Sequence, residues 1–195
     1  MSPRGVAIPD LRERLFAAAE RVVDRDGAAA LTSRAVTAEA DCAKGVLHTH
    51  FSGLDEFVAE LVLDRFARGA RHAEALRDQV GRATVAENLQ DVVAALLDSL
   101  RPAVVGLAMT RPGAASHTRQ GLRSGAPAFD AIQHAVTAYL RAEQHAGRIP
   151  ADSDAEAIAL ALVGTTHHLL MTRTPGQAAD TGATTRRLLA VLLAG

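Results

Sequence analysis

The stretch at residues 32–51, TSRAVTAEADCAKGVLHTHF, decides more about the fold than any other part of the chain. Thr32 is a good helix N-cap, because its hydroxyl can accept a hydrogen bond from a free amide of the first turn. Val36 and Ala40 lie one turn apart and give the helix that follows a small apolar stripe. The stretch therefore opens with a short amphipathic helix.

A tight turn and a second short helix complete the stretch. Asp41 interrupts the first helix, since aspartate tolerates a left-handed backbone at modest cost. The second helix, expected from Ala43 to His50, is too short to stand alone, so it needs a partner helix. Small and hydrogen-bonding side chains on its outer face suit insertion into the major groove of DNA. Its outward positions are Ala43, Lys44, Val46, His48 and Thr49.

The same stretch resembles the DNA-binding domain of the TetR family of bacterial transcriptional repressors. The family pattern is an apolar helix, a glycine, Thr, Arg, an Ile-Ala pair, Ala-Gly-Val, Ser-Lys-Gly, a small residue, Leu-Tyr, any residue and His-Phe. Over about residues 11–61 the matching positions, in register and without gaps, are Gly27, Thr32, Arg34, Val36, Ala40, Lys44, Gly45, Leu47, His50 and Phe51.

The resemblance implies an all-α protein in two parts. A three-helix helix-turn-helix DNA-binding domain is expected at residues 1–53, and a larger helical domain for effector binding and dimerisation at residues 54–195. The departures from the family pattern concern the operator sequence and the affinity rather than the fold. They are Asp41-Cys42 for Gly-Val, Ala43 for Ser, His48 for Tyr and Leu54 for Lys.

The resemblance and the helix geometry together give a set of expected DNA contacts. Lys44 is expected to hold a phosphate and Val46 to touch a thymine methyl, while Thr49 and His48 can reach base edges or phosphates. The amides at the start of the first short helix are expected to help bind a backbone phosphate. The full set is Thr32, Ser33, Arg34, Ala43, Lys44, Val46, His48, Thr49 and His50.

The charge of the chain does not by itself favour DNA. The net charge is −1, and the basic and acidic residues of positions 1–50 cancel. Because phosphate contacts drive most nonspecific affinity, a neutral domain should bind generic DNA weakly and depend on geometry and dimerisation. Lys44 is the only lysine of the chain, and the second short helix carries no acid after Asp41.

The composition is that of a folded, non-membrane protein. Hydrophobic residues make up 48% of the chain, which excludes a disordered chain. No apolar run reaches the roughly 20 residues of a membrane span, and residues 1–10 lack the apolar core of a signal peptide. The single cysteine, Cys42, excludes an internal disulfide. We therefore expect a cytoplasmic protein with no membrane partner.

Apolar residues at helical spacing predict helices along the rest of the chain. The expected helices span about residues 10–26, 54–76, 85–100, 129–144, 152–172 and 184–193, with loops at 110–127 and 174–182. Ser52 with Asp55 is expected to cap the second of these helices, and Asp152 to cap the helix that it begins.

The resemblance places a ligand pocket and a two-fold interface in the larger domain. With no Trp, one Tyr and five Phe, a pocket would be aliphatic and suit a small apolar or amphipathic ligand. The candidates for the pocket are Leu96, Leu100, Leu107, Met109, Phe129, Ile132, His134 and Thr166. The candidates for the homodimer interface are Val163, His167, Leu188 and Leu192.

Other chemistry has simpler structural explanations. Residues two apart on a helix diverge by about 200°, so His48 and His50 cannot bind one metal ion from one side. His167-His168, with His134 and His117 as company, favours a core or interface role over a metal sensor. Cys42, without a second cysteine, fits a small buried hydrophobe better than a redox sensor. The sequence holds no GxSxG, HExxH, CxxC or phosphate-binding glycine loop, so we expect no enzyme, no metal and no cofactor.

Three functional hypotheses follow. The first is a homodimeric repressor that a small-molecule ligand releases from a palindromic operator. The second is a family member that activates transcription or has lost DNA specificity, and the third is a helical enzyme or metal sensor. The sequence favours the first, because a two-fold protein is what a helix-turn-helix needs to read two half-sites.

Overall fold

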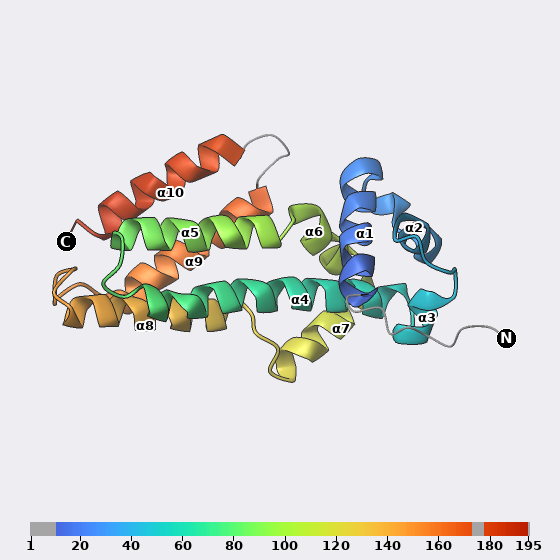
Figure 1. Ribbon diagram of the computed structural model, residues 1–195, viewed down its shortest axis with the longest axis horizontal. Coiled ribbons are helices and arrows are strands. Elements are labelled where there is room, and N and C mark those ends of the chain that lie inside the picture. The colour runs from blue at the N-terminus through green and yellow to red at the C-terminus, as the bar shows by residue number, and fades with distance from the viewer. Residues whose placement is uncertain (1–10, 173–177, 195) are drawn as a thin grey trace. The chain divides into compact units, whose positions relative to one another are not determined.

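The computed structural model describes residues 11–172 and 178–194, and in this part of the chain all regular secondary structure is helical (Figure 1). The all-α fold class expected from the sequence is confirmed. The helices are α1 (Leu11–Asp26), α2 (Ser33–Glu39), α3 (Val46–His50), α4 (Leu54–Glu74), α5 (Val85–Ser99), α6 (Pro102–Thr110), α7 (Pro112–Arg123), α8 (Phe129–His145), α9 (Ala155–Thr172) and α10 (Ala178–Leu192), with 3-10 segments η1 (Ala28–Ala30) and η2 (Ala75–Gln79).

The helices pack into two units. Unit 1 comprises Met1–Val62 and Ala103–Arg119, and unit 2 comprises Leu63–Pro102 and Gln120–Gly195. The packing thus groups α6 and the first part of α7 with the N-terminal helices, whereas the sequence suggests one boundary after residue 53. The division at residue 53 into a DNA-binding part and an effector-binding part stays a prediction.

The core of unit 1 is a cluster of three aromatic rings. Phe16 of α1 packs against Phe57 of α4 with ring centroids 5.5 Å apart, and Phe51, directly after α3, meets Phe57 edge-on at 5.0 Å. All three side chains are buried. Pairs in this geometry contribute about 1 kcal/mol beyond their buried area. The cluster fixes the end of α3 between α1 and the start of α4.

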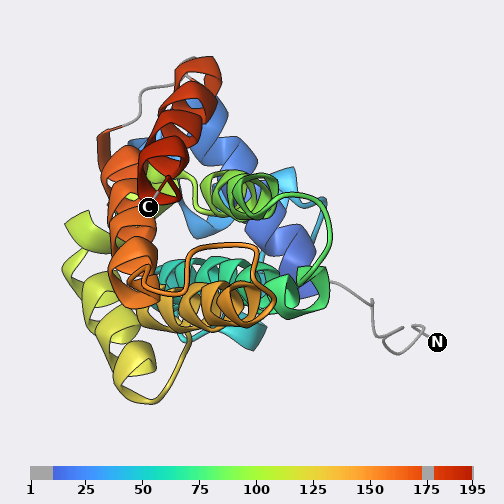
Figure 2. The ribbon, with the colours of Figure 1, turned by 90° about the vertical axis from the view of Figure 1, so that its left-hand side faces the viewer.

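Unit 2 is a bundle of long helices. The C-terminal part of α4 lies beside α5, α8 pairs with α9, and α10 lies along α5 (Figures 1 and 2). Thr84 starts α5 with a capping box: its hydroxyl accepts from the amide of Glu87, and the Glu87 carboxylate accepts from the amide of Thr84. The bundle closes over Leu89, Leu96, Ile132, Leu140 and Leu162, all of which are buried.

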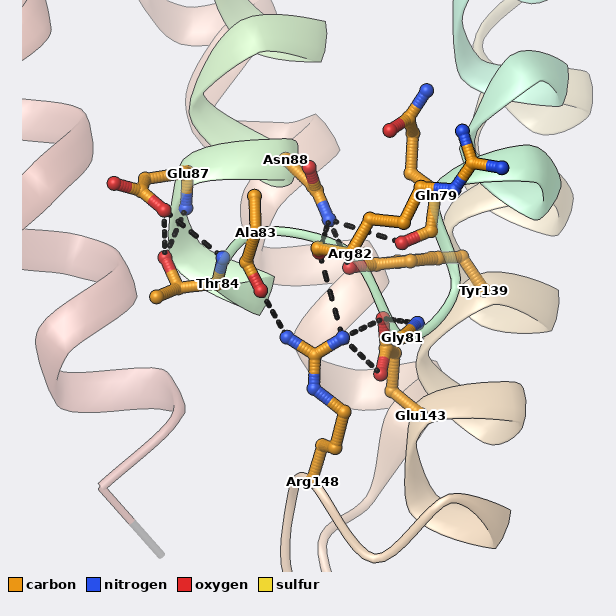
Figure 3. A network of polar contacts seen from close by, with 10 residues as sticks. All are labelled: Gln79, Gly81, Arg82, Ala83, Thr84, Glu87, Asn88, Tyr139, Glu143 and Arg148. Atoms are coloured by element: carbon orange, nitrogen blue, oxygen red, sulfur yellow. Dashed lines mark hydrogen bonds and ion pairs between the residues drawn. The ribbon is translucent and has the colours of Figure 1, made fainter.

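A buried polar network joins the turn before α5 to the end of α8 (Figure 3). The Glu143 carboxylate is 0% exposed, accepts a hydrogen bond from the amide of Gly81 at 3.2 Å and forms an ion pair with Arg148 at 3.4 Å. Arg148 also donates to the carbonyls of Arg82 and Ala83. Ala83 has a φ of 44°, a left-handed conformation that costs energy for a residue with a side chain. The network holds this strained turn in place.

The Tyr139 hydroxyl and the Asn88 amide complete the network. The amide of Asn88 donates to the Tyr139 hydroxyl at 2.8 Å and to the carbonyl of Arg82 at 2.9 Å. Burial raises the pKa of Tyr139 to about 12, and the neighbouring Glu143 carboxylate also raises it, against the Asn88 hydrogen bond, which lowers it. The side chains of Asn88, Tyr139, Glu143 and Arg148 therefore each have a polar partner inside unit 2, although one carboxylate oxygen of Glu143 accepts no hydrogen bond.

The expected loop at residues 110–127 is wrong over most of its length, because α7 occupies Pro112–Arg123. Glycine and serine argue against a helix there, but proline is favourable at the first helical position, and packing overrides the weak local preference. Ala114 is buried, and Gly113 lies against Asp55. Tertiary contacts thus decide this segment.

Three helix starts also differ from expectation. Asp154, not Asp152, caps α9, since its carboxylate accepts from the amides of Glu156 and Ala157. Before α4 the carboxylate of Glu56, not Asp55, accepts the amide hydrogen of Ser52. The last helix begins at Ala178 rather than at residue 184, while residues 174–177 of the expected loop lie outside the described residues.

Candidate nucleic-acid interface

The first short helix forms as the sequence predicts. The Thr32 hydroxyl accepts from the amide of Ala35 at 3.1 Å, which caps α2. Val36 and Ala40 are buried, so the apolar stripe faces the core of unit 1. Asp41 has a φ of 51°, the left-handed backbone expected at the turn. This local geometry turns the chain sharply from α2 towards α3.

The second short helix starts later than expected. The sequence predicts it from Ala43, whereas α3 begins at Val46. The amide of Val46 donates to the carbonyl of Ala43 at 3.0 Å, and this three-residue spacing is that of a turn rather than of an α-helix. Lys44 and Gly45 therefore lie in the turn, and Lys44 is presented by the approach to the helix instead of by the helix itself.

The outer face of α3 remains open to solvent. Leu47 is fully buried and anchors the helix, while His48, Thr49 and His50 are exposed and Val46 is half-buried. The Thr49 hydroxyl donates to the carbonyl of Gly45 at 3.2 Å, which leaves its oxygen able to accept a hydrogen bond from a base or a water. The face combines donors, an acceptor and one small apolar side chain.

Helix α1 fixes α2 through arginines. Arg14 donates to the carbonyl of Ala40 at 2.8 Å, at the end of α2. Arg21 and Arg25 both bind the carboxylate of Glu39, at 2.7 and 2.8 Å, and these hydrogen bonds, that of Arg21 first, hold the pKa of Glu39 below its usual value. These three arginines are thus engaged within unit 1.

The cations of this region divide into two groups. Arg12 pairs with Glu60 at 2.5 Å and lies over the Phe16 ring at 5.1 Å, so it too is engaged. Arg34 and Lys44 are exposed, and neither forms an ion pair within the described residues 11–62. Arg34, in the first turn of α2, and Lys44, in the turn before α3, thus have no ion-pair partner among these residues. The two groups look alike in the sequence, and only the fold separates them.

The start of α4 is held by the turn between α6 and α7. Arg111 donates to the Asp55 carboxylate at 2.7 Å, and a Cβ on Gly113 would lie 2.1 Å from the same carboxylate, so an added side chain would force that carboxylate to move. The hydrogen bonds from Ser52 hold the pKa of Glu56 below its usual value, with a smaller charge contribution from His117. Sequence reasoning missed the contacts of Asp55 with Arg111 and Gly113, because no spacing pattern links residues more than fifty positions apart.

The pocket candidates have different surroundings within the described part of the chain. Leu96, Leu100, Ile132 and Thr166 are buried in unit 2, and the Thr166 hydroxyl bonds to the carbonyl of Leu162 in its own helix. Phe129 packs edge-on between Phe66 and His167, and His134 is exposed. Leu107 is buried in unit 1, and the side chain of Met109 lies outside the described residues. A ligand-binding role for this set stays a prediction.

The dimer candidates lie on a partly exposed surface of α9 and α10. Val163 is buried, Leu188 and Leu192 are half-buried, and His167 is exposed. Sequence reasoning missed the large apolar side chains that are most exposed on these helices: Leu160 at 59%, Met171 at 53% and Val191 at 76%. Their signal in the sequence is weak, because both helices are apolar on several sides.

Metal and membrane alternatives gain no support in the described part of the chain. No group of three or more His, Cys, Asp or Glu side chains there is arranged to hold a metal ion. No helix among the described residues is both long and apolar enough to cross a membrane. Cys42 is half-buried rather than buried, and its thiol donates to the carbonyl of Ala40 at 3.3 Å.

The structure is similar to solved transcriptional regulators over nearly its whole length. PfmR of Thermus thermophilus, a TetR family transcriptional regulator, has a TM-score of 0.61 and 16% identity over 93% of this chain and 98% of that one. GusR of Salmonella enterica has a TM-score of 0.64 and 20% identity, covering 96% of this chain and 100% of that one.

A third similar structure is the transcriptional regulator FadR of Bacillus subtilis in complex with stearoyl-CoA. Its TM-score is 0.62 at 16% identity, over 94% of this chain and 98% of that chain. No family model and no curated protein matches this sequence. The shared architecture is that of all-α helix-turn-helix regulators. More specifically, the chain has the TetR fold, as the residues around the turn predict.

Proposed function

We propose that the protein is a DNA-binding transcriptional regulator that acts as a homodimeric repressor. The observation that carries the proposal is the outer face of α3 and its approach. Leu47 and Phe51 are buried beneath this face, whereas Lys44, His48 and Thr49 point outward into solvent. A rigidly held short helix with exposed donors and acceptors is what major-groove readout requires.

Phosphate contacts come from the cations that form no ion pair among the described residues of unit 1. Arg34, in the first turn of α2, and Lys44, in the turn before α3, are proposed to bind the DNA backbone while α3 enters the groove. Thr32 and Ser33 precede Arg34 at the start of α2. Ala43 lies just before the turn that leads into α3, and His50 is the last residue of α3. Because only a few phosphates are neutralised, the DNA affinity should depend on the helix-turn-helix segments of both protomers binding together.

Dimerisation is supported by the apolar surface of α9 and α10. Leu160, Met171 and Val191 are exposed large hydrophobic side chains, and a Cβ on Gly164 would meet nothing, so a second helix has room to approach. Burial of such a surface by a second copy removes apolar area from water. Leu188, Leu192 and His167 adjoin this surface in our proposal.

Release from DNA on ligand binding is proposed to work through α4, the helix that follows the helix-turn-helix of α2 and α3. Its first turn is held by Arg111 and Gly113, and the same helix continues from unit 1 into unit 2. A small apolar or amphipathic ligand that favours one position of α4 would lower DNA affinity, provided that it binds the two states with different affinities.

The test begins with selection of bound fragments from random double-stranded DNA at about 100 mM salt, where generic phosphate contacts are weakened. We expect a palindrome whose half-sites lie about one or more turns apart. Lys44→Ala with Thr49→Ala should then abolish binding while the dimer remains in size-exclusion chromatography. Arg77→Ala, on an exposed side chain of unit 2, is the matched control. Unchanged binding by the double variant would contradict the proposal, and no enriched sequence would favour a regulator without DNA specificity.

A further inference from the structure

A groove between α4 and α5 in unit 2 has no role in the function proposed above. One cavity of about 250 Å³ lies between His72, Ala75 and Leu76 on one side and Asp91, Val92 and Ala95 on the other. A second, shallower cavity of about 430 Å³ lies against Arg68, Arg71 and His72. His72 lines both cavities, so they lie next to each other along α4, and together we call them the α4–α5 groove.

The two helices pack closely next to the groove. A Cβ on Gly69 would lie 2.5 Å from a methyl carbon of Leu96, so α4 and α5 are in close contact at Gly69. Leu76 and Val92 are buried and form an apolar floor. None of the residues that we expected to form a ligand pocket lines either of these two cavities.

Side chains of opposite charge line the two cavities of the groove. Arg71 and His72 are exposed on α4, and Asp91 is exposed on α5. Neither Arg71 nor Asp91 forms an ion pair within the part of the chain that the structure describes. Nearby Arg68 differs, because its guanidinium donates to Asp64 at 3.1 Å. A cation and an anion without an ion pair among the described residues thus line neighbouring cavities, one of which has an apolar floor.

The far end of the groove is held rigidly. Gln79 and Asn88 line it, and the Asn88 amide is fixed by the Tyr139 hydroxyl at 2.8 Å and by the carbonyl of Arg82 at 2.9 Å (Figure 3). The buried ion pair of Glu143 and Arg148 holds the adjoining turn. A site whose walls are already ordered loses little freedom when it binds a ligand.

We propose that the α4–α5 groove binds a short aliphatic zwitterion, with its carboxylate at Arg71 and His72 and its ammonium group at Asp91. The guanidinium is suited to a planar carboxylate, and the floor of Leu76 and Val92 covers the methylene chain. A ligand with one charge would leave one end of the groove unmatched. Binding at this site is independent of DNA, so it succeeds or fails separately from the function proposed above.

The experiment is calorimetric titration of the full chain, without DNA, with ε-aminocaproate as the probe. Caproate lacks the ammonium group and n-hexylamine lacks the carboxylate, so together they test each end. We expect ε-aminocaproate to bind with a dissociation constant of about 1 mM or tighter, as suits a molecule of this size. Each singly charged probe should bind at least about tenfold more weakly.

Variants locate the site. Arg71→Gln and Asp91→Asn should each weaken ε-aminocaproate binding by about tenfold. The matched controls are Arg77→Gln and Asp98→Asn, since neither residue lines a cavity of the groove, although Asp98 lines, together with Asp91, a neighbouring cavity between α5 and α10. The controls should bind as the unaltered chain does.

Three outcomes would overturn the proposal: no measurable binding of ε-aminocaproate, equal binding of caproate or n-hexylamine, or binding that survives both Arg71→Gln and Asp91→Asn. The comparison of the three probes uses only the unaltered chain, so it stands even if a variant folds poorly. Equal binding of caproate would show that the groove is merely a solvated basic face of α4.

Discussion

The surface around α3 in unit 1 and the buried polar network beside α5 in unit 2 differ in one respect: whether their polar side chains have partners within the chain. Lys44 and His48 are exposed, and no described residue of the chain binds them. Asn88 and Glu143 are buried and bonded within the chain. Unpaired polar groups on a rigid surface can meet a ligand, whereas buried ones cost free energy when a partner is lost. The contrast separates a recognition surface from a structural joint.

The largest expected effect is a loss of stability when the buried polar network around Glu143 is broken. Glu143→Ala removes a buried carboxylate that accepts from the Gly81 amide and from Arg148, whose side chain is 27% exposed, and loss of these charge-assisted hydrogen bonds costs about 3 kcal/mol. We expect that loss in the free energy of unfolding, measured by urea denaturation. Glu156→Ala is the control, because Glu156 pairs with Arg141 at 2.5 Å on an exposed surface. It should cost less than about 1 kcal/mol. Equal effects would show that the network adds no special stability.

A smaller effect is expected where the α6–α7 turn holds the start of α4. Gly113→Ala places a Cβ against the Asp55 carboxylate, which must move and break its pair with Arg111. Overpacking of this kind costs about 1–3 kcal/mol, and we expect it in the thermal unfolding of the chain. Gly106→Ala is the matched control, since its Cβ would meet nothing. In a helix that change should stabilise by up to about 1 kcal/mol. A neutral Gly113→Ala would contradict the close approach.

The smallest expected effect is a pH dependence of the melting temperature that comes from Glu56, in the first turn of α4. Hydrogen bonds from Ser52 lower the pKa of Glu56 in the folded chain below its ordinary value of 4.5. A lowered pKa stabilises the fold above the unfolded pKa, and this stability is lost as pH falls through the folded pKa. Glu56→Gln should therefore lower the melting temperature at pH 6, and the difference should shrink towards pH 3. A difference that persists at pH 3 would point to packing instead.

The turn region shows how far sequence reasoning reaches. The N-cap at Thr32, the left-handed Asp41 and the buried Val36 follow from local chemistry, and the structure confirms each. The start of α3 was misplaced by three residues, since helix ends depend on hydrogen bonds that composition does not fix. Local rules thus locate the candidate interface, but they do not predict that Lys44 lies in the turn before α3 instead of in the helix.

The pairing of charges could not be predicted. Arg21, Arg25, Arg34 and Lys44 are equally basic in the sequence, yet only the last two have no partner in the described part of unit 1. Glu39, which binds the first two, is more than ten residues distant from either in the chain. Long-range pairing depends on how α1 crosses α2, and periodicity within one helix carries no information about that crossing.

The sequence by itself determined an all-α chain, the helix-turn-helix and the apolar faces of the long helices, because capping, turn chemistry and helical spacing act over a few residues. Only the tertiary structure decided that residues 112–123 form a helix, that Arg111 meets Asp55 and that Glu143 is buried. Each of these depends on which distant surfaces come together. Free energy gained from such packing outweighs local preference, so it is settled by the whole fold and not by any single stretch.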